Sequence, residues 1–163
     1  MPRVLIIGLG NSLRRDDRVG EEVVRRIEAH YRDSSDVEAF HCHQPTPELS
    51  EQMSRFETVV FVDAGIGRDA GVVNCQQLSP AASGRTSSHI LTPAQLLALT
   101  HQLYGKKPLS YGVTIGGQSF DLGENMTPVV AAAVDTAVDV VRGLVTDRAT
   151  AALSEGPTSA LDC

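Results

Sequence analysis

Aromatic residues are scarce in this chain of 163 residues: they make up 4% of it, and tryptophan is absent. Proteins that stack the bases of single-stranded nucleic acid need several aromatic rings, so such a binding module is disfavoured. Basic side chains are also few, 14 against 20 acidic ones, for a formal net charge of −6 at pH 7. Because nucleic-acid and anionic-membrane binders present a basic surface, we expect neither kind of partner.

Long apolar runs are missing as well. The run from Val4 to Ile7 is too short for the apolar region of a signal peptide, and nowhere do about 18 apolar residues follow one another. The three cysteines, Cys42, Cys75 and Cys163, are widely spaced and form no C-x-x-C pair, which argues against a disulfide framework or a thiolate zinc site. We therefore expect reduced thiols in a cytoplasmic protein, and the net charge favours a monomer.

Short β-branched runs alternate with helical patterns along the chain. The apolar runs RVLIIG and TVVFVD are typical of strands that are buried on both faces of a parallel sheet. The alternation predicts a three-layer α/β/α sandwich around a mostly parallel sheet of about five strands. Length and composition predict a single domain over residues 1–146 and a flexible tail over 147–163. The expected strands span 3–8, 37–42, 58–63, 72–78 and 109–115, and the expected helices span 17–31, 46–55, 93–104 and 128–144.

Three Thr-Pro pairs, at 46–47, 92–93 and 127–128, mark expected helix starts. A threonine oxygen caps the first helical amides, and proline suits the first helical position because it has no N–H to leave unpaired. Gln95 stands three residues after Thr92, which completes a capping box.

Polar residues stand at three places that follow or adjoin predicted strands, where ligands collect in open α/β sheets. Asp16 and Asp17 come after the Gly-rich turn that follows the first strand, Asp63 ends the TVVFVD strand, and His89 precedes the Thr92 cap. Two carboxylates and an imidazole suit Zn, Ni, Fe or Mn. Asp16 and Asp17 also have an ordinary explanation as acidic residues in a first helical turn. Asp63 is harder to explain, because an ionised carboxylate at the end of an apolar strand needs a partner.

Other site types fit less well. A dinucleotide fingerprint would need glycine where Leu13 stands, and Gly8 and Gly10 are as readily explained by a tight strand-to-helix turn. His41 and His43 share one face of a strand and offer imidazoles, although a surface position is the simpler interpretation. Peptidyl-tRNA hydrolases share the GLGN start, but the motifs that follow it in that family are absent here, and an acidic chain suits tRNA poorly.

An ordered set of motifs resembles the hydrogenase maturation endopeptidases. The set consists of GLGNSLRRDDRVG at 8–20, QPTPELSE at 44–51, FVDAG at 61–65, SSH at 87–89 and TIGGQSFDLGENMTP at 114–128, so the resemblance covers roughly residues 3–145. It implies a phosphorylase/hydrolase-like fold and an aspartic-type, metal-directed endopeptidase. Such an enzyme removes the C-terminal extension from the large-subunit precursor of nickel–iron hydrogenase after nickel insertion.

The resemblance also implies the site residues. Asp17, Asp63 and His89 match the metal-binding and catalytic positions, with Asp16 as the second choice for the first of them. Nickel would be supplied by the precursor, and zinc or another divalent ion would be able to occupy the site in vitro. Arg18 stands where the family commonly has glycine, which would strain the backbone if that position needs a positive φ but not if it lies in the first helical turn.

Two other functions remain open at this level. The chain is either this peptidase or a metal-sensing assembly factor that binds the same precursor without cutting it, because no dedicated nucleophile is visible. A nucleotide-binding regulatory domain is a weaker alternative.

Overall fold

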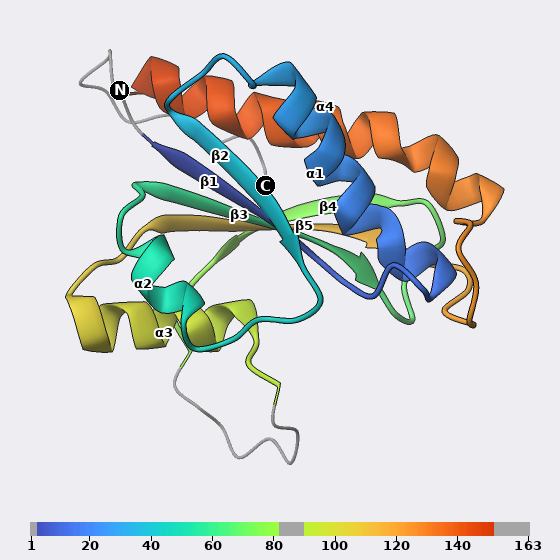
Figure 1. Ribbon diagram of the computed structural model, residues 1–163, viewed down its shortest axis with the longest axis horizontal. Coiled ribbons are helices and arrows are strands. Elements are labelled where there is room, and N and C mark those ends of the chain that lie inside the picture. Colours follow the sequence, from blue (N-terminus) through green and yellow to red (C-terminus); the bar gives the residue numbers. More distant parts are fainter. Residues whose placement is uncertain (1–2, 82–89, 152–163) are drawn as a thin grey trace.

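A five-stranded sheet with the strand order β2-β1-β3-β5-β4 forms the centre of the molecule. The computed structural model describes residues 3–81 and 90–151. Neighbouring strands are parallel except at one edge, where β4 runs antiparallel to β5. The expected mostly parallel sheet is therefore confirmed (Figure 1). The strands are β1 (Val4–Leu9), β2 (Val37–Cys42), β3 (Thr58–Gly65), β4 (Val73–Leu78) and β5 (Leu109–Gly116).

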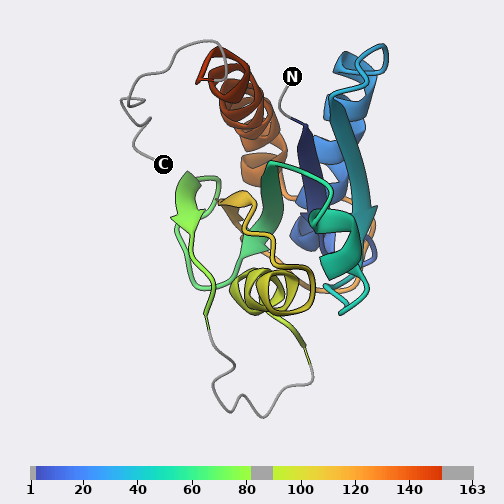
Figure 2. The same cartoon turned by 90° about the vertical axis from the view of Figure 1, so that its left-hand side faces the viewer.

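Helices cover both faces of this sheet, as the expected three layers require (Figure 2). One face carries α1 (Val19–His30) and α4 (Pro128–Ala151), and the other carries α2 (Leu49–Met53) and α3 (Pro93–Tyr104). A short 3-10 helix, η1 (Arg15–Arg18), leads into α1. Within the described part of the chain, no helix is long and apolar enough to cross a membrane.

Strand β3 shows how the apolar runs are used on both faces. Val60 and Val62 are buried with the helices α1 and α4, whereas Val59 and Phe61 are buried with α3. Because successive side chains of a strand alternate between faces, Asp63 continues the row of Val59 and Phe61. The sequence therefore places this carboxylate on the α2/α3 side of the sheet.

Most expected elements occur within a few residues of their predicted bounds, and two helices differ from them. The helix expected at 46–55 is shorter, because α2 begins at Leu49 after a turn that starts at Thr46. The capping box of α3 is confirmed: the Thr92 hydroxyl accepts from the amide of Gln95, whose side chain accepts from the amide of Thr92. Helix α4 extends to Ala151, into the segment 147–163 where we expected a tail, and residues 152–163 lie outside the described part.

The cysteines differ partly from expectation. Cys42 is a free thiol at the end of β2, and burial raises its pKa above the usual value. Cys75 on β4 is disulfide-bonded, so the expectation of three reduced thiols is wrong for this residue.

A candidate carboxylate site at the carboxyl end of the sheet

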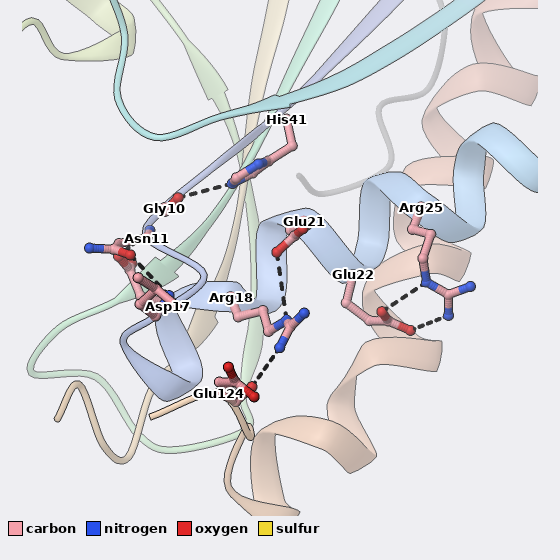
Figure 3. A network of polar contacts seen from close by, with 10 residues as sticks. Gly10, Asn11, Asp17, Arg18, Glu21, Glu22, Arg25, His41 and Glu124 are labelled. Atoms are coloured by element: carbon pink, nitrogen blue, oxygen red, sulfur yellow. Dashed lines mark hydrogen bonds and ion pairs between the residues drawn. The ribbon is translucent and has the colours of Figure 1, made fainter. Parts of the chain in front are cut away.

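Gly10 makes the turn that brings the first loop back toward the sheet. Its φ is +134°, a value that side chains disfavour, and a Cβ on it would lie 2.0 Å from the backbone oxygen of Asp17. The amide of Gly10 donates to the carbonyl oxygens of Cys42 and His43, at 3.2 and 3.1 Å. Nε2 of His41 hydrogen-bonds the Gly10 carbonyl at 2.9 Å (Figure 3). The His41 imidazole therefore fixes this loop to β2, and His43 is exposed beyond the strand end.

Asp17 is held by its own loop. The amide of Asn11 donates to Oδ2 of Asp17 at 2.7 Å (Figure 3). Oδ1 of Asn11 accepts from the amide of Leu13 at 2.9 Å. No hydrogen bond to the second oxygen of Asp17 is found among the described residues. One carboxylate oxygen thus orients the side chain while the other remains available to a ligand.

Asp63 lies close enough to Asp17 for the two carboxylates to interact electrostatically. Burial and, to a smaller extent, the negative charge of Asp17 raise the pKa of Asp63 to about 7, against a smaller opposing effect from the backbone N–H of Ala64. Two like charges in a partly buried site disfavour joint ionisation, and none of the ion pairs found among the described residues involves either carboxylate. The structure therefore brings together two of the three residues expected to bind a metal.

Asp16 belongs to a different environment, although it is adjacent to Asp17. Its side chain is fully buried and accepts hydrogen bonds from the amides of Gln118, Ser119 and Thr127 and from the Thr127 hydroxyl, at 2.7–2.9 Å. Burial alone would raise the pKa of Asp16, but these four donors together hold it below the usual value. Asp16 therefore joins η1 to the segment that precedes α4, and its oxygens are already engaged.

Arg18 occupies its position without backbone strain. Its φ is −76° and its ψ is −11°, so the first-turn alternative for this residue is confirmed. One guanidinium nitrogen donates to the Glu124 carbonyl at 2.6 Å, and Nε lies 3.6 Å from a Glu21 carboxylate oxygen (Figure 3). Apart from Gly10, the residue of this loop with a positive φ is Arg15, at +45°, whose side chain donates to the carbonyl of Asn125.

The complete set of expected ligands is not contained in the described residues. His89, the third expected ligand, lies outside the ranges 3–81 and 90–151. Within these ranges, no group of three or more His, Cys, Asp or Glu side chains is placed to hold a metal ion. The two carboxylates nevertheless suit a divalent cation, because a cation would neutralise the repulsion that raises the pKa of Asp63.

Beside Asp63 the α2/α3 face of the sheet is hollowed into a cavity of about 240 Å3. Sequence analysis did not predict it, although Asn74 and Gln76 both line it. The signal was the alternation within β4, which places the polar side chains of Asn74 and Gln76 on one face of an edge strand. The lining residues are Leu9, Phe61, Asp63, Arg68, Asn74, Gln76, Leu78, Pro93, Gly112, Val113 and Thr114.

Comparison with known proteins defines the fold class. No family model and no curated protein matches this chain. Among solved structures, it is similar to the hydrogenase maturating endopeptidase HybD from E. coli, with a TM-score of 0.72 and 19% identity over 90% of this chain and 93% of that one. The fold is thus the α/β fold found in hydrogenase maturation endopeptidases, as the motifs imply.

Two archaeal structures agree with this assignment. The NiFe hydrogenase maturation protease HybD from Thermococcus kodakarensis has a TM-score of 0.67 and 22% identity, over 87% of this chain and 98% of that one. The maturation protease HycI from the same organism has a TM-score of 0.72 and 20% identity, over 89% and 93% of the two chains. At these identities the similarity establishes the fold.

Proposed function

We propose that this chain is a hydrolase that removes the C-terminal extension from the large-subunit precursor of a nickel–iron hydrogenase. The proposal depends mainly on one observation: Asp17 and Asp63, from separate segments, repel each other at the carboxyl end of the sheet. Ligands collect at this edge in open α/β folds. The similar structures are named as hydrogenase maturation proteases, which supplies the substrate class.

We further propose that the nickel of the precursor is recognised by Asp17, Asp63 and His89. The carboxylates fit a hard or borderline divalent ion, and an imidazole would complete a set with open positions. Zinc or another divalent ion would then occupy the same place in vitro. When bound, such an ion polarises a peptide carbonyl or a water molecule.

Asp17 is the proposed acceptor of a proton from the attacking water. Hydrolysis adds water across the C–N bond, so that one proton must leave the attacking oxygen and another must reach the departing amine. The second oxygen of Asp17 has no hydrogen bond among the described residues, whereas the oxygens of Asp16 are engaged by four donors. An enzyme of this kind is aspartic-type in the sense that carboxylates carry the chemistry, and it acts on its precursor as a cytoplasmic monomer.

The test compares conservative variants by the intact mass of a nickel-loaded precursor. Asp17→Asn and Asp63→Asn should each abolish the loss of the C-terminal extension. Asp139→Asn is the matched control, because that carboxylate is 76% exposed on α4, and it should leave the mass loss unchanged. Cleavage that persists in Asp63→Asn would remove Asp63 from the mechanism. Binding of the precursor without any mass loss by the wild type would instead identify a non-cleaving assembly factor.

A further inference from the structure

The cavity beside Asp63 exists because a glycine occupies the middle of β5. The sheet register places Gly112 directly between Phe61 of β3 and Gln76 of β4. All three residues line the cavity, and Gly112 contributes no side chain to fill it. A volume of about 240 Å3 is ample for one side chain, since a cavity of roughly 150 Å3 already holds a benzene ring.

The residues that line the cavity determine which kind of side chain it binds. Leu9, Phe61 and Leu78 offer apolar contact to a hydrocarbon stem, while Asn74 and Gln76 offer hydrogen bonds at one side. The charged lining residues are Asp63 and Arg68, which have opposite signs.

This combination of charges disfavours charged occupants. An acidic side chain entering the cavity would be repelled by Asp63 and attracted by Arg68, and for a basic side chain the two effects are reversed. Because these effects oppose each other, no net attraction offsets the cost of taking a charged side chain out of water. An uncharged side chain avoids this desolvation cost and keeps the apolar contacts.

We propose that this cavity is a side-chain subsite of the peptide substrate, which admits one uncharged, elongated side chain from a residue next to the cleaved bond. The inference rests on the proposed function, because it places the scissile peptide beside Asp63. It assigns Gly112 the role of setting the size of the accepted side chain.

Gly112 can be changed without disrupting the sheet. A Cβ built on it would lie 3.5 and 3.6 Å from the two terminal methyl carbons of Leu78, which is ordinary contact. Alanine therefore fits, and valine adds two methyl groups at a strand position that favours β-branched residues. Gly143 offers a matched control on α4, because nothing lies within 4 Å of a Cβ built there.

The experiment uses nickel-loaded precursors in which each residue flanking the cleaved bond is changed in turn to Ala, Leu, Asp or Lys. Cleavage is followed by intact mass and binding by biolayer interferometry, with the wild type, Gly112→Ala, Gly112→Val and Gly143→Ala.

At one flanking position the wild type should prefer Leu to Asp and Lys. Gly112→Val should lower kcat/KM for Leu by roughly tenfold or more while sparing Ala, because a methylene group in such a pocket is worth about 10–200-fold. Gly112→Ala should have a smaller effect of the same kind, and Gly143→Ala should match the wild type.

The possible results test the proposed subsite and the proposed peptidase activity separately. Cleavage with the same order of preference in the wild type and Gly112→Val overturns the subsite and leaves the peptidase standing. Binding whose preference changes with Gly112, without cleavage, supports the subsite and overturns the peptidase. Precursors that are neither bound nor cut overturn both. Circular dichroism and thermal unfolding of Gly112→Val verify that its sheet is intact.

Discussion

Replacing Asp63 with asparagine should stabilise the metal-free protein at pH 8 while it abolishes function. The folded protein holds this carboxyl in a partly buried position beside Asp17, and both effects raise its pKa from 3.8 to about 7. At pH 8 the wild type must therefore keep an ionised group where ionisation is disfavoured. Asparagine has nearly the same shape and carries no charge.

The magnitude follows from the shift of the pKa. An increase from 3.8 to about 7 is about 3 units, which at about 1.36 kcal/mol per unit gives an upper limit of about 4 kcal/mol. Asp63 is only half-buried, and water screens part of the interaction, so we expect about 2 kcal/mol. For a protein of this size that corresponds to an increase in Tm of roughly 4–8 °C.

The effect must depend on pH with a definite sign. Below about pH 4 the carboxyl of Asp63 is protonated in both the folded and the unfolded wild type, so that the variant gains nothing. Between about pH 4 and pH 7 the folded state binds the extra proton, and the wild type loses stability as the pH rises. Above about pH 7 the advantage of the variant is complete and constant.

Urea unfolding at pH 4, 6 and 8 in the presence of EDTA measures this difference, with Asp139→Asn as the exposed control. A stability difference between Asp63→Asn and the wild type that is the same at all three pH values would refute the electrostatic argument. Adding Zn²⁺ at pH 8 should stabilise the wild type and not the variant, since a ligand stabilises only the protein that binds it.

Three further substitutions test the local structure around the site. Asp16→Ala should lower the free energy of unfolding by about 3 kcal/mol, measured in urea, because it removes a buried carboxylate that accepts from four donors. A loss below about 1 kcal/mol would contradict this. Gly10→Ala should lower the Tm and reduce Zn²⁺ affinity in calorimetry, because its Cβ would collide with the backbone oxygen of Asp17. Unchanged Zn²⁺ affinity would argue against the role of Gly10 in positioning Asp17. Thr92→Ala should cost about 1 kcal/mol in thermal unfolding, because it removes the cap that accepts from the Gln95 amide, and Thr92→Ser should restore most of it.

The sheet was predictable because its signals are local. The apolar runs that contain Ile6 and Val60 predict strands that are buried on both faces, and the capping box at Thr92 marks the start of a helix. The end of α4 was harder to predict. Residues 147–151 lack a strong apolar pattern, yet helix continues through them.

The candidate site was predictable only in part, because its geometry depends on long-range contacts. The ends of β1 and β3 meet through parallel pairing, which a βαβ pattern predicts, and this brings Asp17 near Asp63. The separate role of Asp16 depends on Thr127, more than a hundred residues away along the chain, so no local pattern reveals it. The cavity over Gly112 likewise depends on the register of β3 against β5 and β4.

The most direct test of the central claim is the intact mass of a hydrogenase large-subunit precursor after incubation with this protein, with and without nickel loading. The account predicts a discrete C-terminal loss in the nickel-loaded sample alone, and no loss with Asp17→Asn. Equal loss from the nickel-free precursor would contradict recognition of the metal. An unchanged mass of a correctly loaded and bound precursor would contradict the peptidase itself.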